Sequence, residues 1–313
     1  MPLYRSHLPQ LERVFVTDGG LETTLVFLEG IDLPCFAAFP LVLAAEGRTA
    51  LTRYFRPYLE LARRHDTGIV LDAPTWRANQ DWGERLGFDA EALAAANRAA
   101  IDFVADLRTR YAAPESPVVL NGVIGPRGDG YRIEGSMSAA EARAYHGAQM
   151  AGFRDSEADM VSAITMTYAE EAIGIALAAR DCGLPAVVSF TLETDGRLPS
   201  GQELGAAIAQ TDGATEGYPA YYMVNCAHPR HVEDALAAGA PWLERIRGIR
   251  ANASEKSHAE LDAATELDIG DPLALGQDYA RLRGTLTRLC VVGGCCGTDH
   301  RHVAAICEAC LPG

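Results

Sequence analysis

Short runs of apolar, mostly β-branched residues alternate along the chain with longer stretches rich in Ala, Leu, Glu and Arg. The apolar runs are nearly continuous, which is typical of strands that are buried on both faces of a parallel sheet. The pattern predicts eight such strands, at residues 14–17, 68–72, 118–123, 160–165, 186–191, 220–225, 246–251 and 289–293.

The stretches between these runs predict helices. Ser138, followed three residues later by Glu141, forms a capping box and marks the start of one of them. The predicted helices cover residues 49–65, 89–111, 139–156, 169–182, 201–211 and 231–238.

Eight strands alternating with helices over 313 residues fit an α/β fold, the (β/α)8 TIM barrel. Counting elements alone leaves an open, doubly wound sheet as the alternative. No Ser/Pro-rich linker or low-complexity tract divides the chain, so we expect a single barrel domain over residues 1–313. The charged stretch 252–272 is expected to be an excursion on this barrel.

Composition narrows the function classes. The chain is 48% hydrophobic with a formal net charge of −15, which argues against nucleic acid as a partner because a phosphate backbone requires a basic face. No apolar run reaches the length of about 18 residues that a membrane span needs. Residues 1–10 lack the apolar core of a signal peptide, so we expect a cytoplasmic protein without a membrane partner. The oligomeric state stays open.

Candidate chemistry lies at the carboxyl ends of the predicted strands, where barrels place their active sites. Cys226 follows the sixth strand, and Cys295 and Cys296 follow the eighth. Because a barrel closes, these ends can converge although they are far apart in the chain. Three thiolates with one open position describe a catalytic zinc site, and the softness of thiolate favours zinc over magnesium or calcium.

Two adjacent cysteines can face one metal only if the backbone turns sharply. We expect the flanking glycines Gly293, Gly294 and Gly297 to provide that freedom. Two other interpretations of Cys295 and Cys296 remain open, a pair of core residues and a vicinal disulfide. The disulfide would make the chain a redox protein that needs no metal.

The remaining cysteines and one nearby histidine have simpler interpretations. Cys35, Cys182 and Cys290 are expected to be buried as small apolar residues, and Cys307 and Cys310 to be thiols on the surface of a terminal helix. A fourth metal ligand is possible at His228, although a histidine in a loop is the commoner case.

Three segments together resemble the homocysteine S-methyltransferase family. They are residues 18–23 (Asp-Gly-Gly-Leu-Glu-Thr), 225–226 (Asn-Cys) and 293–298 (Gly-Gly-Cys-Cys-Gly-Thr), and the resemblance spans roughly residues 14–310. It implies a (β/α)8 barrel in which the three cysteines hold Zn²⁺, while the first loop, with Asp18, Gly19 and Gly20, helps to form the pocket for the thiol substrate.

The resemblance also implies the reaction. The chain is too short for the folate and cobalamin modules of methionine synthase, so it is most similar to the stand-alone enzymes of the family. These transfer a methyl group from a sulfonium donor, S-methylmethionine or S-adenosylmethionine, to homocysteine and so form methionine. The alternatives are a methyltransferase of the same fold for another thiol or selenol, and a non-catalytic zinc-binding or thiol-sensing barrel.

One departure from the family bears on the acceptor. The family usually has a glutamate after the fourth strand, where it holds the amino group of homocysteine. Here the corresponding residues begin with Ile164 and Thr165, so the acid is missing. Glu193, at the end of the fifth strand, can replace it across the barrel mouth; otherwise the acceptor is a different thiol.

Further substrate-binding candidates stand at the ends of other strands. Asn225 precedes Cys226, and Thr165 ends the fourth strand. Asp72 and Trp76 follow the second strand. Asp72 can contact substrate or be a structural partner for a loop amide, and Trp76 can stack on a sulfonium donor through a cation–π contact.

Overall fold

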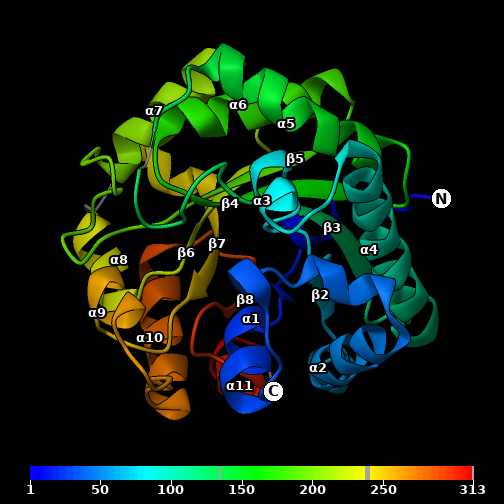
Figure 1. Cartoon of the computed structure of the whole chain (residues 1–313). Coiled ribbons are helices and arrows are strands. Elements are labelled where there is room, and N and C mark those ends of the chain that lie inside the picture. The colour runs from blue at the N-terminus through cyan, green and yellow to red at the C-terminus, as the bar shows by residue number, and fades with distance from the viewer. Residues whose placement is uncertain (134, 237–239, 312–313) are drawn as a thin grey trace.

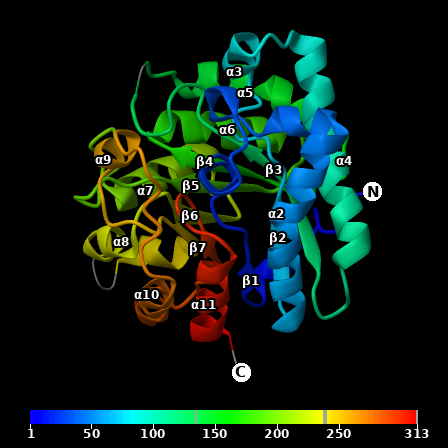
Figure 2. The ribbon, with the colours of Figure 1, turned by 60° about the horizontal axis from the view of Figure 1, so that its bottom comes forward.

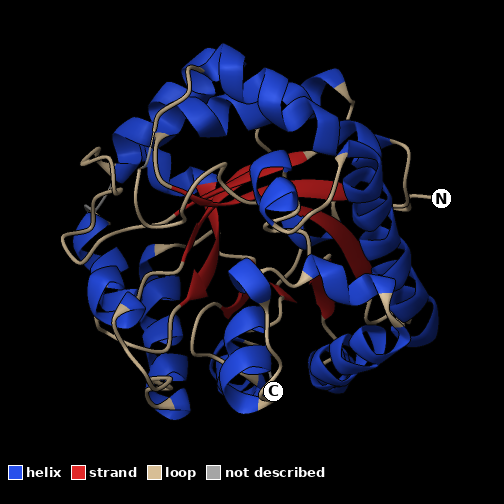
Figure 3. Cartoon of the chain, viewed as in Figure 1, coloured by secondary structure: helices blue, strands red, loops and turns tan. Residues whose placement is uncertain are grey.

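Eight parallel strands close into a barrel in sequential order, with helices around the outside (Figures 1 and 3). The computed structural model describes residues 1–133, 135–236 and 240–311. The strands are β1 (Phe15–Val16), β2 (Gly68–Asp72), β3 (Val118–Ile124), β4 (Met160–Met166), β5 (Ala186–Phe190), β6 (Tyr221–Asn225), β7 (Ile246–Ala251) and β8 (Val291–Gly294).

The predicted (β/α)8 barrel is confirmed, and the open sheet is wrong. Phe15 of β1 pairs with Gly68 of β2 on one side and with Val291 of β8 on the other, so the first and last strands close the ring. Figure 2 shows α11 (His300–Cys310) beside β1 and α2 (Ala45–Arg64) at this closure.

The helices lie close to the predicted ranges, apart from five in the described part of the chain that the pattern did not delimit. Three of these, α1 (Leu21–Thr23), α3 (Gln80–Arg85) and α9 (His258–Asp262), have at most 6 residues, too few for a helical period to show in the sequence. The 3-10 segments are η1 (Pro9–Leu11), η3 (Pro34–Phe36), η4 (Phe39–Leu43) and η5 (Pro241–Arg245), and η2 (Thr24–Leu28) is a π-helical turn. The other helices are α1 (Leu21–Thr23), α3 (Gln80–Arg85), α4 (Ala90–Tyr111), α5 (Ala139–Arg154), α6 (Ala169–Asp181), α7 (Leu204–Thr215), α8 (Pro229–Ala235), α9 (His258–Asp262) and α10 (Pro272–Thr285).

Two details of the helix predictions can be checked directly. Helix α5 begins with the expected capping box, in which the Ser138 side chain accepts from the backbone of Glu141 and the Glu141 side chain accepts in return. The helix predicted over residues 231–238 corresponds to α8, but its last residues, Ala237 and Ala238, lie outside the described part of the chain.

The apolar residues form two layers, one inside the barrel and one between the strands and the helices. Buried side chains on the inner faces of the strands, among them Phe15, Val119, Met160 and Tyr221, fill the lower interior. The barrel is therefore a packed core with its opening at the carboxyl ends of the strands, as the fold requires. Among the described helices, none is both long and apolar enough to cross a membrane.

The predictions for two terminal cysteines are wrong. Cys307 and Cys310 are buried on α11 instead of lying on its surface. Together with Val303 and Ile306, which are also buried, they occupy positions three and four residues apart, so they share the face that packs against the core.

The other isolated cysteines vary in exposure. Cys290 is buried as expected, and Cys182 is half-buried. Cys35 is exposed, so its predicted burial is wrong. It lies in η3 with a φ of 57°, in a connection outside the barrel wall where no apolar layer covers it.

Candidate metal centre and active site

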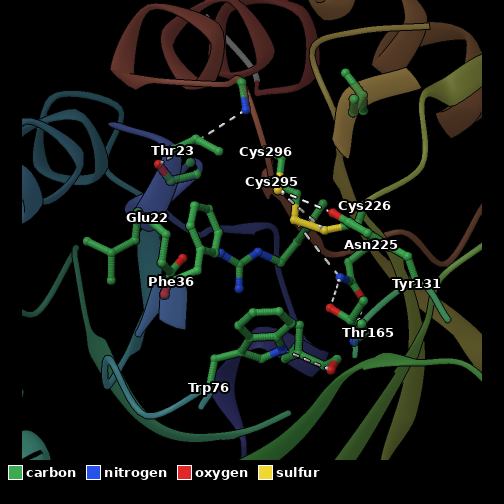
Figure 4. A pocket seen from close by; sticks show the side chains of 18 of the residues that line it. Glu22, Thr23, Phe36, Trp76, Tyr131, Thr165, Asn225, Cys226, Cys295 and Cys296 are labelled. Atoms are coloured by element: carbon green, nitrogen blue, oxygen red, sulfur yellow. Dashed lines mark hydrogen bonds between the residues drawn. A yellow bond between two sulfur atoms is a disulfide. The ribbon is translucent and has the colours of Figure 1, made fainter. Parts of the chain in front are cut away.

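Three cysteine sulfurs meet at the carboxyl end of the barrel. Cys226 follows β6, whereas Cys295 and Cys296 follow β8, and all three sulfur atoms lie within 4.8 Å of one another. Cys226 and Cys295 are joined by a disulfide in this structure, and the sulfur of Cys296 is 3.9 Å from that of Cys226 (Figure 4). The disulfide therefore links the two strand ends and not the adjacent pair Cys295 and Cys296, which the sequence analysis had left open as an alternative.

The geometry and chemistry of these sulfurs fit a zinc ion once the disulfide is reduced. Zinc–sulfur bonds of about 2.3 Å in a tetrahedron place the sulfurs about 3.8 Å apart, close to the observed 3.9 Å. Within the described residues, no histidine or carboxylate joins the cluster. His228 instead caps α8 by accepting from the backbone N–H of Arg230. Three protein ligands leave a fourth position for a substrate, as in catalytic zinc sites.

The backbone around the cysteines is held in an unusual conformation. Cys226 has a φ of 54° and Gly297 a φ of 79°, both in the left-handed region. Gly294 does not have a positive φ, so the expectation that it supplies freedom to turn is wrong. A Cβ on Gly294 would lie 1.9 Å from Oγ1 of Thr298, and the same lack of space applies to Gly293. These two glycines of β8 are required for close packing.

Tyr131 forms one wall of the cysteine cluster. Its hydroxyl lies 3.5 Å from the sulfur of Cys296, and its ring stacks on that of His258 at 4.0 Å. Nε2 of His258 in turn lies 2.6 Å from the carbonyl oxygen of Cys226. Burial raises the pKa of the Cys296 thiol, and the Tyr131 hydroxyl partly opposes this effect by stabilising the thiolate.

A buried guanidinium occupies the centre of the barrel mouth. Arg250 of β7 donates from Nη2 to Asp18 at 2.5 Å and from Nη1 to Asp72. The second oxygen of Asp18 accepts from the hydroxyl of Tyr54 at 3.0 Å, and that of Asp72 accepts from the amide of Asn121 at 2.7 Å. Burial raises the pKa of Asp18 to about 7, against the opposing effect of Arg250. The protein's own donors thus engage all four carboxylate oxygens.

Two of the predicted substrate-binding residues hold strand ends together. Oδ1 of Asn225 accepts from the backbone N–H of Thr165 at 2.9 Å and from the hydroxyl of Ser189 at 2.6 Å. Its Nδ2 donates to Oγ1 of Thr165 at 2.8 Å. Thr165 has a φ of 66°, so these bonds fix an unfavourable backbone conformation at the end of β4. Both residues line the cavity, and Nδ2 of Asn225 also lies 4.0 Å from the sulfur of Cys295.

The cysteines open into a cavity of about 390 Å³. The loop after β7, predicted as an excursion over residues 252–272, contributes a large part of its wall. Seven carboxylates and two guanidiniums lie along the described part of the wall, so the cavity is negative. They are Asp18, Glu22, Asp72, Asp129, Asp262, Glu266 and Asp268, with Arg77 and Arg250.

Trp76 lines the same cavity on the side away from the cysteines (Figure 4). Its indole N–H donates to the carbonyl of Ile164 at 3.3 Å. The guanidinium of Arg77 lies 4.9 Å from the centre of the Trp76 ring and 4.0 Å from that of Trp82. The ring therefore already contacts one cation of the protein.

The family model of homocysteine S-methyltransferase matches residues 15–310 of the chain. This chain belongs to that family. Crystal structures of the homocysteine methyltransferase MmuM from Escherichia coli have the same fold. The oxidized form is 18% identical with a TM-score of 0.72, and the metallated form is 19% identical with a TM-score of 0.68; each match covers 94% of this chain and 95% of the other. None of the curated protein sequences matches this chain.

In this member of the homocysteine S-methyltransferase family, Ile164 stands where the sequence analysis noted that the family usually has a glutamate. It therefore brings no charge to the cavity. Ile164 lines the wall through its side chain. Glu193 does not line it. The Glu193 carboxylate lies 3.2 Å from Nδ1 of His258, in a separate small pocket beside Cys226, so it does not reach the main cavity.

The sequence analysis missed several cavity residues, among them Arg250, Glu22, Arg77 and Tyr131. Arg250 could have been identified from the sequence, because a charged residue inside a buried strand needs a partner within the barrel. Glu22 stood within the matched first motif, whereas Arg77 and Tyr131 lie in connections without periodicity. The structure is needed to show that all four face the cavity.

Proposed function

We propose that this family member is a zinc-dependent S-methyltransferase that transfers a methyl group from a sulfonium donor to a thiol, with homocysteine as acceptor and methionine as product. The observation that carries this proposal is the convergence of three cysteine sulfurs at the floor of a negative cavity. The residues proposed to hold Zn²⁺ are Cys226, Cys295 and Cys296.

The metal site would activate the acceptor thiol through its charge. Cys226, Cys295 and Cys296 would hold the zinc ion, which would lower the pKa of the acceptor thiol enough to make it a nucleophile at neutral pH. The acceptor sulfur forms a bond to the methyl carbon while the bond from that carbon to the donor sulfur breaks, and the electron pair stays on the donor. The donor leaves as a neutral thioether, so the protein needs no general acid.

The protein's residues contribute binding and orientation. The carboxylates of the wall attract a cationic donor and disfavour an anionic one. We propose that Trp76 contacts the sulfonium through a cation–π interaction on ring surface that Arg77 leaves accessible. At about 390 Å³ the cavity is near the small end of ligand pockets. This size favours S-methylmethionine over the bulkier S-adenosylmethionine as donor.

Asp18, Gly19 and Gly20 shape the floor and do not bind the acceptor's charge. A Cβ on Gly20 would lie 2.7 Å from the carbonyl oxygen of Cys295, so only glycine lets the first loop approach the cysteines this closely. Asp18 is held by Arg250. These contacts place the first loop against the thiols, where it restricts the direction from which an acceptor enters.

The decisive experiment measures zinc content and methyl transfer together. Reduced, zinc-loaded protein is incubated with homocysteine and either S-methylmethionine or S-adenosylmethionine, and methionine is quantified. Alanine variants of Cys226, Cys295 and Cys296 should each lose most of the zinc and the activity. A matched control, Cys182→Ala, removes a half-buried cysteine away from the cavity and should keep both. Retention of stoichiometric zinc in any of the three variants would refute the site.

The disulfide between Cys226 and Cys295 favours one second candidate, a thiol-sensing or redox barrel. The E. coli relative is known in oxidized, metallated and apo forms, which supports the view that one cysteine set can adopt several states. A redox protein would cycle the disulfide without metal, whereas the methyltransferase requires the reduced, metal-loaded form. Loss of methionine formation upon chelation, with recovery by zinc, separates the two.

A further inference from the structure

Cys226 has a backbone conformation that its neighbours must stabilise. Its φ of 54° lies in the left-handed region, which is unfavourable for an L-residue unless surrounding contacts hold it. Its backbone N–H donates to the carbonyl of Arg250 at 3.1 Å. Its carbonyl oxygen accepts twice, from Nε2 of His258 at 2.6 Å and from Nδ2 of Asn252 at 3.1 Å. The direction in which Cys226 carries its sulfur therefore depends on side chains from the segment after β7.

The imidazole of His258 is itself held on its edges and on one face. The residue is buried, and Nδ1 lies 3.2 Å from the carboxylate of the half-buried Glu193, while Nε2 donates to Cys226. The ring of Tyr131 stacks on it at 4.0 Å, with 18° between the two planes. The hydroxyl of Tyr131 lies 3.5 Å from the sulfur of Cys296. One imidazole thus connects the backbone of one cysteine with the aromatic wall beside another.

His258 and Glu193 lie outside the main cavity. Both line the separate small pocket beside Cys226, and of the residues named here only Cys226 borders both spaces. His258 is also the first residue of α9, and the same short helix contributes Leu261 and Asp262 to the wall of the main cavity. A ligand in the main cavity does not touch the imidazole. Any effect of His258 on chemistry in that cavity must therefore pass through the residues that it holds in place.

We propose that His258, oriented by Glu193, is a positioning residue that directs the sulfur of Cys226 toward the sulfurs of Cys295 and Cys296. Outer hydrogen bonds of this kind fix the orientation of metal ligands, and their loss typically weakens metal binding about 10- to 100-fold. The inference rests on the proposed function in one respect, because it takes Zn²⁺ as the ion that the three sulfurs hold. The position of the Cys226 sulfur can also be measured without any metal.

The first measurement is the zinc dissociation constant of the reduced protein, obtained by chelator competition. His258→Phe keeps an aromatic ring for Tyr131 but removes both nitrogen contacts, and it should raise this constant about 10- to 100-fold. His258→Gln places an amide donor near the position of Nε2 and should return the constant to within about 3-fold of the wild type. His7→Phe is the control, because His7 forms an exposed pair with Glu12 at 3.0 Å and does not line the cavity.

The second measurement follows the same sulfur without metal. Metal-free protein is equilibrated with reduced and oxidized glutathione, and the fraction that carries the Cys226–Cys295 disulfide is quantified. One molecule of glutathione disulfide oxidises the two thiols and is itself reduced to two molecules of glutathione. Loss of the hydrogen bond to the Cys226 carbonyl in His258→Phe should lower this equilibrium constant about 10-fold. His258→Gln should restore it.

A double variant tests whether the carboxylate acts through the ring. Glu193→Ala should weaken zinc binding, but combined with His258→Phe it should add no further loss, because the two residues act as a unit. Unchanged zinc affinity and an unchanged glutathione equilibrium in His258→Phe would overturn the inference, as would equal losses in the Phe and Gln variants. If the wild type binds no zinc while its glutathione equilibrium still depends on His258, the proposed function fails and the positioning role stands.

Discussion

Replacing Arg250 with methionine should destabilise the barrel strongly, although the two side chains are similar in length. Arg250 is buried and neutralises Asp18 and Asp72 at once. Its Nε also donates to the carbonyl of Gly294 at 3.2 Å, next to the cysteines. Methionine fills much of the space but leaves two buried carboxylates facing each other without a counter-charge.

The magnitude follows from that uncompensated charge. Removing one partner of a buried ion pair costs about 3 to 5 kcal/mol, a large share of the roughly 5 to 15 kcal/mol that stabilise a typical protein. A proton shared between Asp18 and Asp72 can partly replace the guanidinium. The loss should therefore be larger at pH 8 than at pH 5.5, where such a proton is more readily bound.

Thermal unfolding of the wild type and Arg250→Met at both pH values tests this reasoning. At pH 8 we expect the midpoint to fall by about 6 to 20 °C, given about 2 to 4 °C per kcal/mol in a large single domain. Arg197→Met is the control, because Arg197 makes an exposed pair with Glu203 that should contribute little. A midpoint for Arg250→Met within about 2 °C of wild type at pH 8 would refute the argument.

Three further outcomes follow from the site. The raised pKa of Asp18, about 7, makes its contribution to stability greatest at low pH and lost as the pH rises toward 7 and above; Asp18→Asn should remove that part of the pH dependence of unfolding. Tyr131→Phe removes the hydroxyl beside Cys296 and should weaken zinc binding about 10-fold in a chelator competition. An unchanged affinity for zinc would show that this hydroxyl does not support metal binding. Asn225→Ala leaves several buried groups unpaired and should lower the free energy of unfolding by about 3 kcal/mol in chemical denaturation. A loss below about 1 kcal/mol would contradict the role of Asn225 in holding the strand ends together.

The barrel could be predicted from the sequence because its strands are buried on both faces. The ranges 68–72 and 246–251 were predicted with the bounds that β2 and β7 have in the structure. Helix ends were less predictable. The helix expected over residues 201–211 begins at Leu204 and ends at Thr215, because residues 201–203 belong to the preceding turn and the apolar pattern does not mark either end.

The candidate site was predictable only where a residue of a reactive type stands at the carboxyl end of a strand, because barrels place their active sites there. Cysteines at the carboxyl ends of two strands of a closed barrel must lie at the same rim, so topology allows Cys226 to meet Cys295. The partners of charged residues do not follow in this way. Glu193 was expected to face the acceptor and contacts His258 outside the main cavity instead, because the direction of a loop side chain depends on packing that the sequence does not encode locally.

The pairing of β1 with β8 also determines when a newly made chain can complete its barrel. Chains fold as they leave the ribosome, with the N-terminal part available first. The open edges of β1 and β7 stay unpaired until Val291–Gly294 has been synthesised, and Cys295 and Cys296 emerge directly afterwards. The chain therefore gathers its three thiols in the same step that covers its last exposed strand edges.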